Sequence, residues 1–378
     1  MSILIGADIV PGPTNIDLFK NSKVETLLGY ELWEVLNHAD YKVFNLEVPL
    51  TDCLNPIEKQ GPNLIAPTSC VHGFKSMGID LFTLSNNHIM DQGVQGVLST
   101  IEVLNESDIA YVGAGKDIKE AMEPYYVKIK GKMYGIYACT EHEFSIAGNK
   151  SPGANPFDPL ESLDHIYNMK KNCDYIIVLY HGGKEQYRYP SPYLQKVCRK
   201  MVEKGANLVI CQHSHCIGCK EKYMEGTIVY GTGNFIFDYQ TNEYWNSSLL
   251  LKIDDIGRIN YIPLVKKGGG VRLAAKKEAG NILLSFEERS SEIMNKEIVE
   301  RKYCTLATES LPDYFMYFTG KKYDFAFRVI NKLTNNKLQK YYTNKRLPRM
   351  KNAIRNYIEC EAHRELILKG LNQDVWKS

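Results

Sequence analysis

Residues 207–215 read NLVICQHSH, an apolar stretch of strand character that runs directly into two histidines. A similar arrangement occurs at residues 174–181, DYIIVLYH, and at residues 41–47, YKVFNLE, where the stretch ends in a glutamate. Largely apolar runs of this length are typical of strands that are buried on both faces of a sheet. The three segments therefore predict a central sheet that carries polar side chains at the ends of its strands.

Segments with helical periodicity alternate with these and further apolar strands. The helices are expected at residues 31–39, 71–77, 93–105, 163–171 and 193–204, and further strands at residues 2–5, 79–85, 109–112, 125–129 and 133–139. This βαβα order predicts an α/β architecture in which helices cover the sheet. More helices are expected at residues 323–333 and 352–371. For a chain of 378 residues we expect one large domain at residues 1–287 and a basic helical extension at residues 288–378.

Charge is unevenly distributed along the chain. The net charge is only +2, which gives no reason to expect nucleic acid as a partner. Residues 291–378 contain 17 Lys and Arg against 10 Asp and Glu, a net charge of +7, while the preceding residues carry 29 against 34, a net charge of −5. The basic C-terminal region is therefore expected to contact the acidic body, a partner, or a membrane surface peripherally.

The ten cysteines are scattered along the chain, and no apolar run is long enough to span a membrane. The first residues lack the basic and apolar regions of a signal peptide. We therefore expect a cytoplasmic protein with free thiols, and the sequence leaves open whether it forms a homo-oligomer.

Six residues with metal-ligand chemistry follow predicted strands. They are Asp8, Glu47, Asn87, His181, His213 and His215. In open α/β sheets, sites form beyond the carboxyl ends of the strands, so we expect these side chains to meet at one edge. Mixed imidazole, carboxylate and amide sets suit divalent Mn, Fe, Zn or Co. Because two neighbouring cations need a bridging carboxylate, Glu47 is expected to lie between them.

Each of these residues also has an ordinary structural interpretation when it is taken alone. Asp8 could cap a helix or form a turn, residues 86–88 could form a turn, and His181 could be a hydrogen-bonded core histidine. Five strand ends that all carry ligand-type side chains are hard to explain separately. The joint pattern therefore favours a metal site over the separate structural roles.

Several motifs together resemble the CapA family of bacterial capsule synthesis proteins, which is named for poly-γ-glutamate capsule formation. They occur in the family's order at residues 6–11 (GADIVP), 45–49 (NLEVP), 85–93 (SNNHIMDQG), 181–183 (HGG), 212–215 (QHSH) and 230–238 (YGTGNFIFD). The resemblance covers roughly the first 270 residues. The family is similar to the calcineurin-like metallophosphoesterases, which implies a four-layer αββα sandwich and a site for two metal ions.

The resemblance also implies roles for individual residues. Asp8 and His215 would hold one metal, and Asn87, His181 and His213 the other, with Glu47 between them. His88 would protonate a leaving oxygen, and a carboxylate such as that of Asp91 can orient an imidazole for this work. The phosphoesterase motif Asp-x-His has Val10 at its third position here, which makes Asn45 a candidate to complete the first site.

Polar and aromatic side chains near these motifs are candidates to contact substrate. The stretch 181–192, HGGKEQYRYPSP, is unusually polar and aromatic for a segment that directly follows a buried strand, although a solvated surface loop is an equal alternative. The candidates for substrate binding are Asn45, Lys59, Glu141, His142, Glu185, Tyr187, Tyr189 and Asn234, and Glu143, Lys184 and Arg188 are further neighbours of this kind.

These features predict a metal-dependent hydrolase of phosphoesterase type, acting on a small molecule or a polymer intermediate in capsule or poly-γ-glutamate synthesis. Amide hydrolysis by the same site stays open. Two alternatives remain: a non-catalytic subunit of a capsule-polymer assembly complex, and a general cytosolic phosphodiesterase.

Overall fold

Two β-sheets form the centre of the first part of the chain in the computed structural model, which describes residues 2–237 and 242–371. The first sheet has the strand order β16-β15-β14-β1-β2-β3-β4, and β13 also pairs with β1. Its strands are β1 (Ser2–Val10), β2 (Tyr41–Leu46), β3 (Leu81–Thr83), β4 (Ala110–Val112), β13 (Asn234–Phe237), β14 (Ser247–Asp254), β15 (Ile259–Lys267) and β16 (Gly270–Leu273). Strands β1 to β4 are parallel, so their carboxyl ends lie at one edge.

The second sheet has the strand order β11-β12-β10-β9-β7-β6. Its strands are β6 (Tyr125–Ile129), β7 (Lys132–Thr140), β9 (Tyr175–His181), β10 (Leu208–Gln212), β11 (Lys220–Tyr223) and β12 (Gly226–Tyr230). The four central strands β7, β9, β10 and β12 are parallel, whereas β6 and β11 pair antiparallel at the two edges. A small separate pair joins β5 (Ala114–Gly115) and β8 (Gly153–Ala154).

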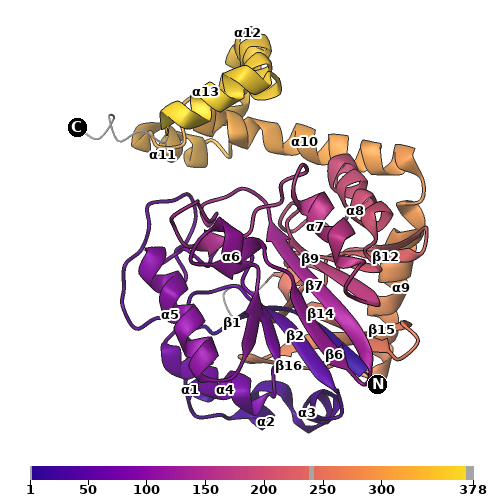
Figure 1. Cartoon of the computed structure of the whole chain (residues 1–378). Helices are drawn as coiled ribbons and strands as arrows, with labels where there is room; N and C mark the ends of the chain where they lie inside the picture. Colours follow the sequence, from indigo (N-terminus) through magenta and orange to yellow (C-terminus); the bar gives the residue numbers. More distant parts are fainter. Residues whose placement is uncertain (1, 238–241, 372–378) are drawn as a thin grey trace. The chain divides into compact units, whose positions relative to one another are not determined.

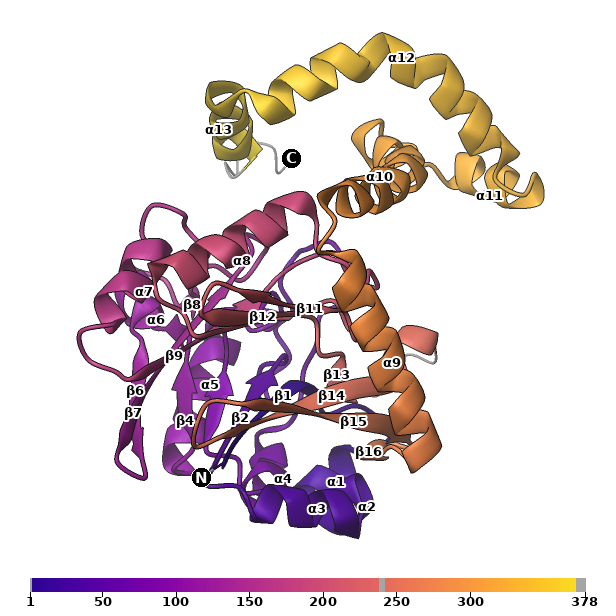
Figure 2. The ribbon, with the colours of Figure 1, turned by 90° about the vertical axis from the view of Figure 1, so that its right-hand side faces the viewer.

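The two sheets pack face to face, and helices cover both outer faces (Figures 1 and 2). A shared core cluster joins Ile3 and Ile5 of the first sheet to Ile177 and Ile210 of the second. The helices outside the first sheet are α1 (Ile16–Lys20), α2 (Val24–Leu28), α3 (Tyr30–Asn37), α4 (Val71–Ser76) and α5 (Gly93–Glu106). Those outside the second are α7 (Ser162–Met169) and α8 (Pro192–Lys204). The predicted four-layer αββα sandwich is confirmed.

Local sequence signals define where helix α8 begins and ends before the chain enters strand β10 of the second sheet. The hydroxyl of Ser191 accepts the Leu194 N–H at the start of α8, and Pro192 occupies the first turn, where its missing N–H costs nothing. Gly205 ends the helix with φ of 124°, a conformation that glycine adopts without steric penalty. Strand β10 therefore begins at a defined point and delivers the two following histidines to the sheet edge.

A further long helix of the first compact unit, α9 (Lys276–Glu292), packs against β15 and β11. Its Phe286 is fully buried in the core cluster between the sheets. Short elements are α6 (Ile118–Met122) and two 3-10 helices at Thr68–Cys70 and Glu243–Trp245. The compact unit extends to Val299. The boundary expected after residue 287 therefore falls inside α9, because Ile293 and Val299, which follow this helix, still belong to the buried core.

The second compact unit begins at residue 300, and the regular elements in its described part are all helices. Its helices are α10 (Lys296–Phe318) from Glu300 onward, α11 (Phe325–Leu333), α12 (Lys337–Glu359) and α13 (Glu361–Leu371). Phe315 packs near Tyr342, and Phe327 lies edge-on to the same ring at 5.7 Å. No helix in the described ranges is long and apolar enough to cross a membrane.

Three expected elements differ in extent from the structure. Strand β1 continues through Asp8 to Val10, whereas residues 2–5 were expected, and β3 spans only Leu81–Thr83 of the expected residues 79–85. The helix expected at residues 352–371 is interrupted at Cys360, which has the extended ψ of 116° and separates α12 from α13. Asp238, the last residue of the matching motifs, lies outside the described residues.

Candidate metal centre

The register of the first sheet brings three polar side chains together around Asp8. Asp8 pairs with Asn45 of β2 on one side and with Asn234 of β13 on the other. The pairing register shifts between Ile5 and Asp8, so the strand is irregular next to Asp8. Asp8 thus lies inside β1 and not beyond its end as predicted. A Cβ at Gly6 would lie 1.9 Å from the Phe44 ring, so only glycine fits beside this irregularity.

Four donor atoms converge on one point of this edge. His181 Nε2 lies 3.0 Å from Asn87 Oδ1, 3.1 Å from His213 Nδ1 and 3.2 Å from Glu47 Oε1. His181 is the last residue of β9 and is paired with Gln212 of β10, so the register carries His213 beside it. Nitrogen and oxygen atoms with lone pairs that cluster in this way point toward a common centre, as the ligands of a metal ion do.

A second group shares Glu47 with the first. Ligand atoms of Asp8, Glu47 and His215 lie within 4.8 Å of one another, as do those of Glu47, His181 and His213. His215 Nδ1 is 3.6 Å from Asp8 Oδ2 and 2.9 Å from Asn234 Oδ1. The structure therefore brings all six predicted ligands to one edge, and Glu47 belongs to both groups.

The carboxylate of Glu47 has no hydrogen-bonding partner, although it is fully buried. Neither of its oxygens receives a hydrogen bond, and the same is true of Asp8 Oδ2. A buried carboxylate without a partner is costly, because its charge has lost water and gained nothing in exchange. Burial and the neighbouring Asp8 raise the pKa of Glu47 to about 8. A cation between the two groups would supply the missing partner, so the residues present fit divalent metal ions.

The histidines are in the protonation states that such a site needs, with one exception. Burial lowers the pKa of His181 to about 4, and burial together with the other two histidines lowers the pKa of His213 well below 6.5. Both rings are therefore neutral at pH 7 and have lone pairs available for a metal. Burial opposes the charge on His215 as well, but Glu47, Asp8 and Asn234 outweigh it and raise its pKa to about 9.

The backbone at the two neighbouring histidines is strained. His213 has φ of 82° and His215 has φ of 53°, in the left-handed region that side chains other than glycine rarely adopt. Each such residue costs about 1–3 kcal/mol and persists only where its surroundings fix it. Here the ring of Trp245 lies 4.7 Å from that of His215 and helps to fix it.

His88 lies next to this cluster and has a buried carboxylate partner. Its Nδ1 is 2.6 Å from Asp91 Oδ2, which also accepts the N–H of Leu64 at 2.6 Å. The ammonium group of Lys59 donates to the other oxygen of Asp91, and its nitrogen is 3.3 Å from His88 Nδ1. Asp91 is fully buried and the Lys59 side chain is 2% exposed. These three residues form one fixed unit with a single imidazole at its outer end.

The other residues expected at the site lie in different surroundings. Asn45 is fully buried and its amide donates to Asp8 Oδ1 at 2.8 Å, so it holds that carboxylate in place. Glu141 accepts the N–H of Gly183 at 3.1 Å, and Tyr189 donates to Glu292 Oε2 at 2.5 Å. Glu185 and His142 are exposed, whereas Tyr187 is partly buried beside Tyr189.

Two positioning residues were missed by sequence reasoning. The amide of Asn86 donates to Asn45 Oδ1 and to the Leu46 carbonyl, and its Oδ1 accepts the N–H of His88. Its place between a strand and His88 was a usable signal. Trp245 reaches His215 from a distant 3-10 helix, and nothing in its neighbouring sequence indicates this contact.

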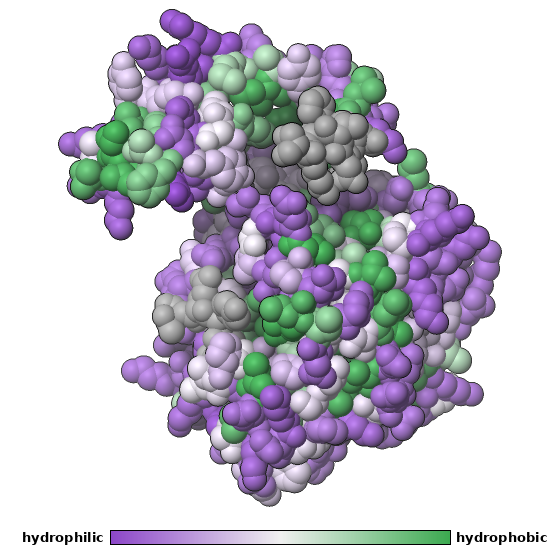
Figure 3. Space-filling model, turned by 90° about the vertical axis from the view of Figure 1, so that its left-hand side faces the viewer, coloured by the Kyte–Doolittle hydropathy of each residue, from purple (hydrophilic) through white to green (hydrophobic). Residues whose placement is uncertain are grey.

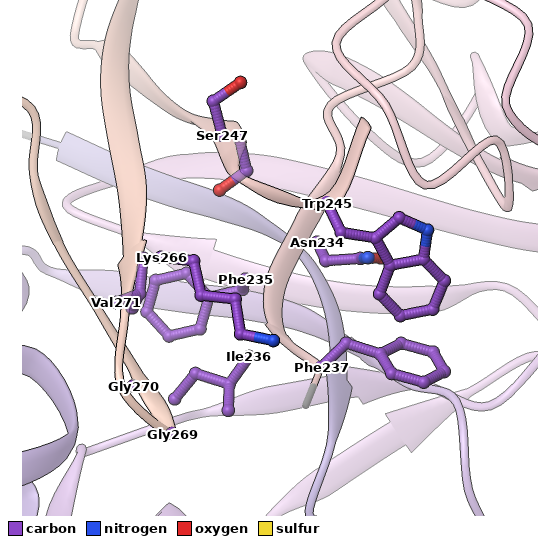
Figure 4. A pocket seen from close by; sticks show the side chains of 11 residues that line it. Asn234, Phe235, Ile236, Phe237, Trp245, Ser247, Lys266, Gly269, Gly270 and Val271 are labelled. Carbon is purple, nitrogen blue, oxygen red and sulfur yellow. The ribbon is translucent and has the colours of Figure 1, made fainter. Parts of the chain in front are cut away.

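A small pocket adjoins the Asn234 side of the cluster. Figure 4 shows Asn234, Phe237 and Trp245 around it, with the Lys266 side chain extended across toward them. Its volume is about 10 Å³, room for about one water molecule. It is therefore too small to hold a substrate in this conformation.

The two packed sheets and the carboxylate–imidazole edge define an αββα sandwich with a candidate metal-binding site at one edge. The family described as "Bacterial capsule synthesis protein PGA_cap" matches residues 3–239, and the chain belongs to this family. The resemblance drawn from the motifs is thereby confirmed.

Two relatives of this chain have names that refer to capsule or PGA biosynthesis. The capsule biosynthesis protein CapA of Bacillus anthracis is 30% identical over 241 residues, which is 61% of this chain and 59% of that protein. The PGA biosynthesis protein CapA of Bacillus subtilis (strain 168) is 28% identical over 237 residues, 61% of this chain and 62% of that protein. The chain thus spans about three fifths of the length of these relatives.

Among solved structures, a novel phosphatase from Mycoplasma pneumoniae covers 70% of this chain and 93% of its own length, with 12% identity and a TM-score of 0.43. The four-layer assignment depends on the two sheets and their helices.

Proposed function

We propose that this chain is a metal-dependent hydrolase of phosphoesterase type that acts in the cytoplasm on an intermediate of capsule or poly-γ-glutamate synthesis. The observation that carries the proposal is the Glu47 carboxylate, buried without a hydrogen-bonding partner and shared by two ligand groups. Selection for stability alone does not explain such a group, because an apolar or amide side chain would cost less there.

The two ligand groups would hold two divalent cations, of which Mn, Fe and Zn suit the mixed nitrogen and oxygen donors. Asp8 and His215 would bind one, Asn87, His181 and His213 the other, and Glu47 both. A bound pair of such cations supplies Lewis acidity and offsets the negative charge that develops during hydrolysis. Asn45 and Asn234 would hold Asp8 and His215 in place through the hydrogen bonds described above.

His88 would deliver the proton to the leaving group. Its Nδ1 faces Asp91 Oδ2 at 2.6 Å, so that nitrogen carries a proton and Nε2 is the atom available to a substrate. Asp91 is held by the Leu64 N–H and by Lys59, which keeps the imidazole in one orientation. A positioned acid of this kind typically contributes about 10²–10⁴-fold in rate.

The family and the cationic side chains after His181 support a phosphoester as the substrate class. A phosphoester suits a site of this type, since metal ions and cationic side chains neutralise phosphoryl oxygens. Lys184 and Arg188, in the segment after His181, would add cationic contacts, and Glu141, Glu185, Tyr187 and Tyr189 would line the approach. An amide such as a γ-glutamyl bond is a second candidate, favoured by the family's name.

The test combines metal analysis with a substrate panel. The purified protein should contain up to two divalent transition metals per chain by elemental analysis. With Mn, Zn or Fe supplied, it should hydrolyse an aryl phosphodiester, an aryl phosphomonoester or γ-glutamyl peptides, and Asn87→Ala and His181→Ala should abolish that activity. Metal-loaded protein that is inert on every class would favour a non-catalytic subunit of an assembly complex. Broad phosphodiester activity without effect on capsule polymer would favour a general phosphodiesterase.

A further inference from the structure

The strongest feature outside the metal centre is a concentration of positive charge in the second compact unit. Residues 321–355 contain eleven lysines and arginines and a single acid, Asp324. This segment forms α11, the following turn and most of α12. Basic surface helices are often merely solvated, so charge alone does not identify a partner. The apolar residues on the same helices provide the further evidence that identifies a partner.

Helix α11 has apolar side chains on two of its sides. Phe327 points inward, where it meets the Tyr342 ring at 5.7 Å. Phe325, Val329 and Leu333 are spaced four residues apart, which places all three on a different side of the helix from Phe327. They are 72%, 41% and 78% exposed, and the neighbouring Ile330 is 49% exposed. Figure 3 shows hydrophobic patches lying directly beside hydrophilic side chains on this part of the chain.

Cations border this apolar stripe along one side. Arg328 and Lys332 precede Val329 and Leu333 by one residue each, and with Lys321 and Lys322 they line a hollow of about 360 Å³. Lys321 is paired with Asp324 at 2.8 Å. Within the described part of the chain, no carboxylate forms an ion pair with Lys322, Arg328 or Lys332. Three positive charges thus surround a concave site beside exposed apolar side chains.

We propose that this face of α11 docks on an anionic phospholipid bilayer. Phe325, Val329 and Leu333 would enter the boundary between headgroups and acyl chains, and the cations around the hollow would receive lipid phosphates. An amphipathic helix with cations beside an apolar stripe binds membranes through both terms together. A dissolved acidic polymer or a nucleic acid would satisfy the cations but leave the stripe in water, so these partners explain only half of the surface.

Vesicle flotation with the full-length protein tests the proposal. We expect binding to vesicles of phosphatidylcholine mixed equally with phosphatidylglycerol, little binding to phosphatidylcholine alone, and weaker binding as salt rises. The double change R328Q/K332Q should weaken binding roughly 30-fold, about fivefold for each cation. Leu333→Ser should weaken it about tenfold, because its side chain loses an apolar environment.

The matched control is R349Q/K351Q, which removes the same charge from α12 outside the hollow and the stripe. It should change binding much less than R328Q/K332Q. Equal losses from the two double variants, or equal binding to both kinds of vesicle, would overturn the proposal. Retention of soluble poly-γ-glutamate without vesicle binding would overturn it in favour of an acidic polymer. Far-UV circular dichroism of each variant checks that the helices are intact, and Phe325→Ser provides a second, independent change in the stripe.

Discussion

The candidate metal-binding edge of the sandwich and the outer face of α11 depart from ordinary burial in opposite directions. At the edge, Asp8, Glu47 and three histidines are at most 6% exposed, and the carboxylate of Glu47 has no hydrogen-bonding partner. On α11, Phe325 and Leu333 are more than 70% exposed. In the first region ionisable side chains are buried away from water, whereas in the second region apolar side chains are exposed to it.

Both departures cost free energy, and neither is needed to make a sandwich or a helix. A protein that retains such an unfavourable feature does so where the binding of another molecule offsets its free-energy cost. The difference between the regions indicates what that molecule is. Buried carboxylates and imidazoles suit small cations, whereas exposed apolar and basic side chains suit an extended surface.

Changing Glu47 should have the largest effect. Glu47→Gln keeps the shape of the side chain but removes the charge shared by the two ligand groups, so metal-dependent turnover should fall by about 10³-fold or more. In metal-free protein the same change should raise or leave unchanged the melting temperature, because an unpaired buried carboxyl is lost.

Metal titrations of the melting temperature distinguish this from a structural role. Metal should stabilise the original protein and have little effect on Glu47→Gln. The exposed Glu25 provides the matched control, and Glu25→Gln should leave both measurements unchanged. A strongly destabilised metal-free Glu47→Gln protein would contradict the assignment.

Two phenylalanines compare the regions directly. Phe286 is fully buried and packs 5.1 Å from the Tyr261 ring, so Phe286→Ala should lower the free energy of unfolding by about 3–5 kcal/mol. Phe325 is 72% exposed, and Phe325→Ala should change it by no more than about 0.5 kcal/mol. Denaturant unfolding of both variants measures the contrast. A large loss of stability from Phe325→Ala would show that its ring is needed for folding.

His88 and His213 should separate proton delivery from metal binding. His88→Ala should lower turnover by about 100-fold while metal occupancy stays unchanged, since its ring faces Asp91. His213→Ala should lower occupancy itself, because its Nδ1 is part of the converging donor set. Elemental analysis and steady-state kinetics on the same preparations give both quantities. Equal loss of metal in the two variants would make His88 a ligand.

The smallest expected effect is the pH dependence of the affinity for metal. The pKa of Glu47 is raised to about 8 and that of His215 to about 9, so these two residues together hold at least one proton at pH 7 in metal-free protein. Metal binding requires them to release it, so affinity should rise with pH by up to about tenfold per unit for each proton released. Calorimetry in two buffers of different ionisation enthalpy measures the release. Net proton uptake on binding Zn²⁺ or Mn²⁺ would contradict it.

Strand and helix positions were largely readable from the sequence, because apolar runs and 3.6-residue periodicity are local signals. The hairpin at β6 and β7 and the helices α5 and α8 fall within one or two residues of their expected bounds. The strand boundary at Asp8 was not readable. An irregular register needs the partner strands, and residues 6–8 carry no apolar pattern of their own.

The sequence by itself determined which chemistry is available: six ligand-type side chains near strand ends, a His88–Asp91 pair, and a basic C-terminal region. Only the tertiary structure decided how they combine. Strand register brought Asp8 beside Asn45 and Asn234, the packing of two sheets left Glu47 in both ligand groups, and Trp245 reached His215 from far along the chain. It also showed which apolar residues of α11 stay exposed. Periodicity records which residues share a face of one element, but pairing and burial depend on elements distant in sequence.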